Sequence, residues 1–346
     1  MAIWTTSFGD VPAYDSHVHI VAAPDKFKGT ATAREITAAI CRAASEAGHT
    51  CTEVPLADGG DGTLEALGGA NRVSRVTGPL GEPVDAEWRL EKGLAVIEMA
   101  RTSGLVLAGG RKRNDPLAAS TTGVGELIGE AVDGGAETII VGVGGSATTD
   151  GGLGAIEAIG SPEQIRGVDL IVACDVRTKF VDAARVFGPQ KGATDAQVAL
   201  LQNRLVSLVE TYKTRFGVDV SNLERGGAAG GLSGGLAALG ARLEDGFQIV
   251  AEHVALADAL EAADLVVTGE GFIDNESFDG KVVGGVATMA ATHGVSVLAI
   301  AGQVFDEDDA EPSGDFDMIS LTEEFGLSKA LKNPTMCVYD ALRSRF

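Results

Sequence analysis

Apolar residues along this chain fall in short β-branched runs that alternate with segments of helical spacing. The clearest run, Thr138 to Val141, predicts a buried strand. A loop rich in glycine, serine and threonine follows as far as Gly152, and helical spacing continues over Leu153 to Ile159. A strand, a glycine-rich turn and a helix in this order predict a βα unit of a parallel sheet.

Similar units lie on both sides of this one. A strand from His17 precedes a helix over 33–47, which Thr30 or Thr32 can cap and Gly48 ends. A strand over 50–56 completes a β-α-β unit. Further strands are predicted over 84–90, 94–99, 168–173, 263–268 and 295–300, and further helices from 64 and over 125–132, 195–215 and 281–293. The pattern therefore predicts an α/β fold, with 84–90 and 94–99 as an antiparallel pair.

Length and charge narrow the class of protein. At 346 residues the chain exceeds one typical core, which predicts two domains. The formal net charge of −22 argues against a nucleic-acid partner but leaves room for a locally basic site that binds a small anion. No run of about 18 apolar residues occurs, so we expect no membrane span.

Two further features point to a cytoplasmic protein. The N-terminus lacks the basic and apolar regions of a signal peptide. The four cysteines, Cys41, Cys51, Cys174 and Cys337, form no CxxC pair and show no metal-binding spacing. We therefore expect reduced thiols, buried or partly exposed.

Acidic residues and lysines follow the ends of the predicted strands, at the sheet edge where α/β proteins bind ligands. Carboxylates can hold Mg²⁺, lysines can neutralise a transferred phosphate, and glycine-loop amides can position it. The set therefore favours phosphoryl transfer, although the GxxxxGK[ST] motif of P-loop enzymes is absent. The acids are Asp25, Asp58, Asp61, Asp150, Asp175, Glu270 and Asp274, and the lysines are Lys26, Lys28, Lys191 and Lys281.

Two other interpretations of the motifs receive less support. Residues 142–147 fit the loose GxGxxA form of a dinucleotide fingerprint, which would indicate an oxidoreductase. A ribose-binding acid should follow about 20 residues on, and the nearest strand-end acid, Asp175, lies well beyond that. His17 and His19 are spaced as in metal hydrolases but lack further histidine partners, so a strand start is favoured.

Taken in order, eleven segments over residues 17–302 resemble the type I glycerate kinase family. The segments are VAAPDKFKGTATA, PLADGGDGTLEAL, GPLGEPVDA, AVIEMARTSGL, TTGVGELI, GVGGSATTDGG, VACDV, FGPQKGA, GGAAGG, ADLVVTGEGFID and the GK of FDGK. The resemblance implies ATP- and Mg²⁺-dependent phosphorylation of D-glycerate, usually to 2-phosphoglycerate. It also implies two α/β domains, one of them flavodoxin-like or Rossmann-like, with one inserted into the other and the active site in the cleft.

On this resemblance we expect four segments along the chain. Residues 1–16 would be an N-terminal extension, 17–76 with 262–346 a discontinuous first domain, and 77–261 the inserted second domain. A monomer or homodimer is expected.

The resemblance also suggests roles for single residues. Asp58 or Asp175 would accept the proton of the glycerate hydroxyl or hold Mg²⁺, and the two assignments stay open. Lys28 and Lys191 would bind the substrate carboxylate or the transferred phosphate. The residues expected to bind ATP are Gly144, Gly145, Ser146, Asp150, Glu270 and Lys281.

Several positions depart from the family pattern. Lys26 stands where the family has serine, Thr149 where it has asparagine, and Phe272 where a polar residue is common. The family's CDVTNPL is changed from Arg177 onward, and a family stretch is missing around Gly160 to Val168. A catalytically silent ligand-binding homologue is therefore the second alternative to a kinase.

Overall fold

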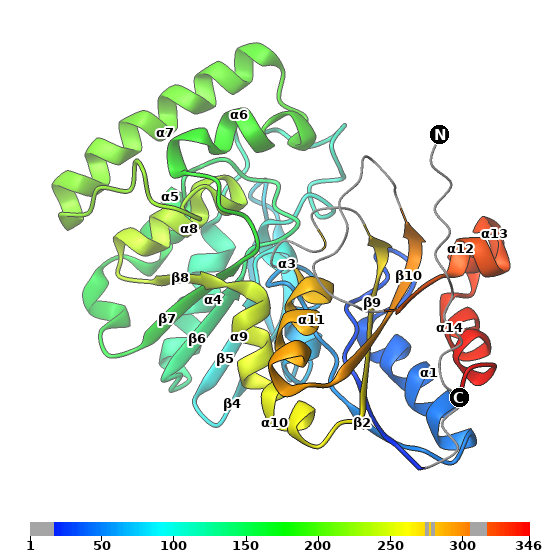
Figure 1. Cartoon of the computed structure of the whole chain (residues 1–346). Coiled ribbons are helices and arrows are strands. Elements are labelled where there is room, and N and C mark those ends of the chain that lie inside the picture. Colours follow the sequence, from blue (N-terminus) through cyan, green and yellow to red (C-terminus); the bar gives the residue numbers. More distant parts are fainter. Residues whose placement is uncertain (1–16, 274–276, 278–280, 305–316) are drawn as a thin grey trace. The chain divides into compact units, whose positions relative to one another are not determined.

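The computed structural model describes residues 17–273, 277, 281–304 and 317–346 and divides the chain into two compact units (Figure 1). Unit 1 is formed by Met1–Ala57 with Val250–Phe346, and unit 2 by Asp58–Ile249. The extension predicted over 1–16 lies outside the described residues. Both units combine helices with a sheet, so the α/β class predicted from the sequence is confirmed.

Unit 1 is built on a five-stranded sheet in the order β11-β10-β9-β1-β2, in which every pair is parallel. The strands are β1 (His19–Ala22), β2 (Thr50–Glu53), β9 (Leu265–Ile273), β10 (Ser296–Val304) and β11 (Asp317–Ser320). The helices are α1 (Ala33–Glu46), α10 (Leu256–Glu261), α11 (Val282–His293), α12 (Leu321–Phe325), α13 (Leu327–Lys332) and α14 (Pro334–Arg343), and α9 (Gly246–His253) spans the boundary between the units.

Apolar side chains cover both faces of this sheet. Along β10, Leu298 and Ile300 pack in a core with α1 and α14, whereas Ala299 and Ala301 pack in a second core with Val283 of α11. Successive side chains of a strand point to opposite faces, so β10 is covered on both sides. This explains why its sequence is a continuous apolar run and not an alternating pattern.

The connection from α1 to β2 carries a disulfide that the sequence did not suggest. Helix α1 begins at a capping box, in which Thr32 accepts a hydrogen bond from the amide of Glu35 and the Glu35 carboxylate accepts from the amide of Thr32. Cys41 of this helix is bonded to Cys51 of β2. The expectation of reduced thiols is therefore wrong for this pair. It holds for Cys174 and Cys337, which are free and buried.

Unit 2 is built on a six-stranded sheet in the order β3-β4-β5-β6-β7-β8. Strands β3 to β5 pair antiparallel and β5 to β8 pair parallel. The strands are β3 (Arg72–Thr77), β4 (Pro83–Glu91), β5 (Leu94–Glu98), β6 (Thr138–Gly142), β7 (Asp169–Cys174) and β8 (Arg242–Asp245). The antiparallel pair predicted at 84–90 and 94–99 is confirmed as β4 and β5.

The helices of unit 2 pack around one continuous core. They are α2 (Thr63–Ala66), α3 (Ala100–Ser103), α4 (Thr122–Asp133), α5 (Leu153–Ile159), α6 (Ala183–Phe187), α7 (Asp195–Phe216) and α8 (Ala228–Ala238), with short 3-10 turns η1 (Pro162–Ile165), η2 (Phe180–Asp182) and η3 (Pro189–Lys191). No helix of the described residues, in either unit, is long and apolar enough to cross a membrane.

The structure differs from the predicted element list at the sheet edges. Strands β3, β8 and β11 were not predicted, and the chain passes into unit 2 at Asp58 and not near Val76. Strand β3 pairs with β4 over six residues, which places it in the sheet of unit 2. All three missed strands lie at an edge of their sheet, where half of the surface need not be apolar and the sequence signal is weak.

Helix α8 contains a left-handed segment that depends on glycine. Ala229, Gly230 and Gly231 all have positive φ, and Gly230 accepts a hydrogen bond from the amide of Gly151 at 3.0 Å. A Cβ placed on Gly230 would lie 2.0 Å from the carbonyl oxygen of Thr148. The glycine therefore lets the start of α8 press directly on the loop after β6.

We expect Gly230→Ala to destabilise unit 2 more than Gly240→Ala, measured as the free energy of unfolding in urea. Both glycines have positive φ, but a Cβ on Gly240 meets no atom within 4 Å. The control should therefore lose only the conformational cost of about 1–2 kcal/mol, whereas Gly230→Ala adds a steric overlap. Equal losses for the two variants would contradict the close approach.

Candidate functional site

The carboxyl ends of β5 to β8 lie at one edge of the unit 2 sheet because these strands are parallel. The loop after Asp58 runs over this edge, where Gly59 accepts a hydrogen bond from the amide of Val143 at 3.0 Å. A Cβ on Gly59 would lie 2.9 Å from the carbonyl carbon of Ala173 and 2.8 Å from the Cα of Gly246. The absence of a side chain thus lets this loop contact the ends of β6, β7 and β8.

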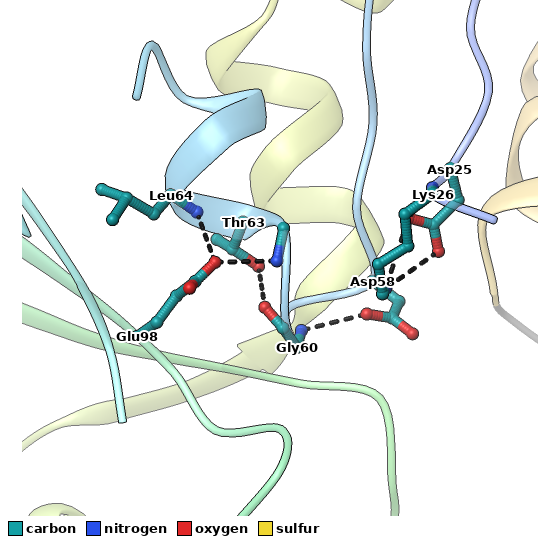
Figure 2. A network of polar contacts seen from close by, with 8 residues as sticks. Asp25, Lys26, Asp58, Gly60, Thr63, Leu64 and Glu98 are labelled. Atoms are coloured by element: carbon teal, nitrogen blue, oxygen red, sulfur yellow. Dashed lines mark hydrogen bonds and ion pairs between the residues drawn. The ribbon is translucent and has the colours of Figure 1, made fainter. Parts of the chain in front are cut away.

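The two predicted catalytic carboxylates lie on this edge. Asp58 is partly buried, and its Oδ1 accepts the amide of Gly60 at 3.0 Å (Figure 2). Asp175 is exposed and directly follows β7. No group of three or more histidine, cysteine or acidic side chains that could hold a metal is found among the described residues. Two carboxylates suit Mg²⁺, which often takes one or two from the protein and its remaining ligands from phosphates and water.

Glu98, at the end of β5, anchors the same loop and was not predicted. Its Oε1 accepts the amides of Gly62 at 2.8 Å and Leu64 at 2.9 Å (Figure 2). Its Oε2 accepts from Nε of Arg101 at 2.9 Å. The side chain is buried. Its position at the end of a predicted strand, within AVIEMARTSGL, was the available signal. These contacts give it a structural role in holding the loop.

The glycine loop after β6 approaches the Asp58 loop closely. A Cβ on Gly144 would lie 2.7 Å from the Cα of Gly60. Gly145 has a φ of +66° and is exposed, and its carbonyl accepts the amide of Leu105 at 2.9 Å. Ser146 is partly buried and pairs with Gly104 in an isolated bridge. The predicted anion cradle at Gly144, Gly145 and Ser146 is therefore held in place by backbone contacts and is open at Gly145.

Asp150, at the end of this loop, is buried and accepts four hydrogen bonds. Its Oδ2 accepts from the amide and the hydroxyl of Thr121, both at 2.8 Å, and from the amide of Gly154 at 3.3 Å. Its Oδ1 accepts the amide of Gly152 at 3.1 Å. The carboxylate ties the start of α4 to the start of α5. These contacts indicate a structural anchor, whereas the sequence suggested a nucleotide ligand.

Lys191 is buried beneath the same loop, at 2% exposure. Its Nζ donates to the carbonyl oxygen of Thr148 at 2.6 Å and lies 5.9 Å from the ring centroid of Phe187. Burial lowers the pKa of the Lys191 ammonium from 10.5 to about 7, against the opposing effect of the Asp150 charge. The residue can therefore change its charge near neutral pH.

Arg225 is a second residue at this edge that sequence reasoning missed. Its guanidinium donates to the carbonyl oxygen of Cys174 at 2.6 Å and to Asp245 Oδ2 at 3.0 Å, and so links the ends of β7 and β8. Its φ is +66°, an uncommon value for a residue other than glycine. No motif marked it, because its partners lie far away in the sequence.

Unit 1 carries a separate group of charges at the carboxyl ends of β1 and β9. Asp25 is buried, its Oδ1 accepts the amide of Lys26 at 2.6 Å, and the Lys26 ammonium lies 3.4 Å from both carboxylate oxygens (Figure 2). Lys28 is exposed, two residues further on. The turn that carries it closes at the bridge between Phe27 and Ala31.

The predicted residues of the GEG and FDGK motifs also belong to unit 1. Glu270 lies in β9 and is partly buried. A Cβ on the adjacent Gly271 would lie 2.9 Å from the Cα of Phe27, so β9 and the Lys28 turn are in close contact. Lys281 immediately precedes α11 and is partly buried. Asp274 lies outside the described residues.

Unit 2 therefore brings together Asp58, the glycine cradle and Asp175 at one sheet edge, with Lys191 under the cradle. Unit 1 brings Lys28 next to the strand of Glu270. Backbone amides, ammonium groups and carboxylates are the groups with which proteins bind phosphate and magnesium. The geometry at these two sheet edges therefore supports binding and positioning of anions.

Comparison with known proteins identifies the family to which this chain is similar. A model of the glycerate kinase family matches residues 20–162 and 161–343. The glycerate 2-kinase of Escherichia coli strain K12 is 40% identical over 328 residues, which cover 83% of this chain and 86% of that protein. The glycerate kinase of Bacillus subtilis strain 168 is 40% identical over 325 residues, with 82% and 85% covered.

A solved structure extends the agreement to the fold. The crystal structure of a protein described as a glycerate kinase 2 from Salmonella typhimurium LT2 superposes with a TM-score of 0.81 at 35% sequence identity. It covers 95% of this chain and 98% of that chain. The junction of the two matched segments, at residues 161–162, falls within Gly160 to Val168, where the sequence predicts a missing family stretch.

We expect Asp150→Asn to lower the free energy of unfolding by about 1–3 kcal/mol. The amide can accept on one side only, and its NH₂ group would face an N–H donor in place of an acceptor. Urea unfolding would measure the loss. Asp219→Asn, at an exposed carboxylate that accepts the amide and hydroxyl of Ser221 and pairs with Lys213, is the matched control and should lose less stability than Asp150→Asn, because solvent screens its contacts. An Asp150→Asn protein as stable as the control would contradict the anchor role.

We expect the wild-type protein to gain stability relative to Lys191→Met as the pH rises from about 7 toward 10.5. Over this interval the unfolded chain keeps the lysine proton and the folded chain has lost it, so rising pH favours the folded state. Below about pH 7 both states hold the proton and the difference should be flat. Urea unfolding of both proteins across this range would test the prediction, and a difference that does not change with pH would contradict it.

Proposed function

Because this chain belongs to the glycerate kinase family and is thus a phosphotransferase, we propose that it transfers the γ-phosphoryl group of ATP to D-glycerate. The proposed product is 2-phosphoglycerate. The observation that carries the proposal is family membership over almost the whole chain, with the family's glycine loops and charged motifs at the carboxyl edges of both sheets.

The proposed nucleotide ligands are the glycine cradle and two charged residues of unit 1. The amides of Gly144 and Gly145 and the hydroxyl of Ser146 would bind ATP phosphates, with Lys281 and Glu270 as further contacts. The exposed position of Gly145 supports this role. Asp150 is retained as the residue that fixes the end of the cradle, since its oxygens accept four hydrogen bonds.

Asp58 and Asp175 are the proposed ligands of Mg²⁺, and one of them is the proposed base for the glycerate hydroxyl. When bound, Mg²⁺ neutralises the charge that develops on the phosphate oxygens. Either Asp58 or Asp175 can be the base, and we do not assign this role to one of them. A base here would only need to accept one hydroxyl proton as the phosphoryl group arrives.

Lys28 and Lys191 are the proposed cationic contacts of the substrate carboxylate or of the transferred phosphate. Phosphoryl transfer needs little covalent chemistry from the protein, so such groups act by positioning and by neutralising charge. The exposed ammonium of Lys28 and the buried one of Lys191 differ in environment. A buried charge acts in a lower dielectric and is the more effective of the two.

The alternative of a catalytically silent homologue rests on the departures from the family pattern. The side chain of Arg177 is exposed, and its Nε lies 3.6 Å from Oε1 of Glu224. The side chain of Phe272 is 43% exposed. Arg177 pairs with Glu224, whereas the Lys191 ammonium donates to Thr148, so the change at Arg177 leaves the Lys191 contact in place. The departures therefore favour altered substrate preference over loss of activity.

We expect glycerate-dependent release of ADP by the wild-type protein in a coupled assay with ATP and Mg²⁺. Asp58→Asn, Asp175→Asn and Lys28→Ala should each lower kcat by about 10²–10³-fold, with thermal unfolding unchanged. Lys332→Ala, at an exposed lysine of α13, is the control. ³¹P NMR of the product would identify the phosphorylated hydroxyl. A folded wild-type protein that binds glycerate without turnover would establish the silent homologue instead.

A further inference from the structure

Two buried polar atoms of unit 2 have no hydrogen-bond partner, and both belong to residues next to the contacts of Lys191. Among the described residues of this unit they are Oδ1 of Asn114 and Oγ1 of Thr149. Asn114 donates to the Lys191 backbone carbonyl, and Thr149 follows Thr148, whose carbonyl accepts from the Lys191 ammonium. Buried polar groups in folded proteins are nearly always hydrogen-bonded, so unpartnered ones call for an explanation. A ligand that completes both atoms is one such explanation.

The direction of the Asn114 side chain is fixed by its own hydrogen bonds. Its Nδ2 donates to the carbonyl oxygens of Ala147 at 3.0 Å and of Lys191 at 2.9 Å. A flipped amide would set its oxygen against these two carbonyl oxygens, so the observed orientation is the only favourable one. Oδ1 therefore faces away from both carbonyls as an unused acceptor. Its natural complement is a hydroxyl group or another N–H or O–H donor.

Thr149 and Lys191 supply hydrogen-bond donors, whereas Asn114 Oδ1 is an acceptor. Thr149 is 0% exposed, and its hydroxyl has no partner. The Lys191 ammonium has three N–H donors, of which one reaches the carbonyl oxygen of Thr148. A carboxylate is the complement of these donors, because its oxygens accept several hydrogen bonds and it neutralises the buried cation. Together the cluster matches a ligand that carries both a carboxylate and a hydroxyl.

We propose that Asn114, Thr149 and Lys191 form the subsite of the acceptor substrate, a small hydroxy acid. Lys191 and Thr149 bind its carboxylate, and Asn114 Oδ1 accepts a hydrogen bond from the hydroxyl that is not phosphorylated. Asn114 is the only partly exposed member of the three, so the substrate enters from its side. The inference rests on the proposed kinase function and adds to it a residue that sets substrate specificity.

Deoxy analogues of glycerate test the role of Asn114. D-lactate lacks the 3-hydroxyl and 3-hydroxypropanoate lacks the 2-hydroxyl, so one of them keeps the reacting hydroxyl and lacks the other. We expect wild-type kcat/KM for that analogue to be at least about 10²-fold below the value for D-glycerate. In Asn114→Ala the ratio should fall below about 10-fold. If neither analogue is turned over, their inhibition constants against glycerate give the same ratio.

The ratio of kcat/KM for glycerate to kcat/KM for the analogue distinguishes loss of substrate recognition from a structural effect of the substitution. Asn114→Ala also loses the two contacts that hold the loop, but that loss lowers kcat/KM for both acceptors alike. Asn203→Ala, at an exposed position of α7, is the matched control and should leave both values unchanged. An Asn114→Ala ratio equal to that of the wild type would overturn the subsite. A wild-type protein without glycerate-dependent turnover would overturn the kinase function itself.

Thr149→Val tests the second member of the subsite. Valine keeps the shape of threonine and removes a hydroxyl that has no partner in the protein, so thermal stability should be unchanged or higher. We expect the KM for glycerate to rise at least about 10-fold, with the KM for ATP unchanged. Unchanged kinetics for both substrates would remove Thr149 from the site.

Discussion

Direct contact between backbone segments at the carboxyl edge of the unit 2 sheet constrains everything built on it. The Asp58 loop, the loop after β6 and the start of α8 approach one another where side chains would not fit. A Cβ on Gly144, Gly235 or Gly230 would lie 2.7 Å or less from the neighbouring backbone. Glycine is required there for space, and it leaves amide groups close to any bound anion.

Some charged groups at this sheet edge hold the loops in place, and others are able to bind a ligand. Glu98 and Asp150 are buried, and their oxygens accept backbone amides, so they fix the loops. Lys191 is buried with one hydrogen bond and a pKa lowered to about 7. In a chain of net charge −22, Lys191 is thus buried away from water, and Asp150 is an acid whose charge acts on it. Such a cation is poorly satisfied until an anion binds.

Sequence patterns predicted the elements that have long, regular signals. The strand at β6 and the helices α5 and α7 occur where the spacing placed them, and the ordered motifs indicated the family. Edge strands β3, β8 and β11 were missed because many of their positions are exposed or partly exposed and they lack a continuous apolar run. The anchoring of Asp150 by Thr121, the amide orientation of Asn114 and the disulfide depend on contacts between separate segments. Such contacts cannot be predicted from a local sequence pattern. The residue types therefore indicated a site, but they did not show which of its residues hold the loops and which could contact a substrate.

The disulfide of unit 1 gives the two units different chemistry toward reducing agents. Cys41 and Cys51 close a short covalent loop between α1 and β2, which restricts the unfolded chain of unit 1 and so favours its folded state. Unit 2 has one cysteine, Cys174, whose thiol is buried and whose pKa burial raises to about 12. A thiol reductant therefore weakens one half of the molecule and leaves the other untouched. The redox state of its surroundings would set the stability of the Lys28 half without altering the half that carries Lys191.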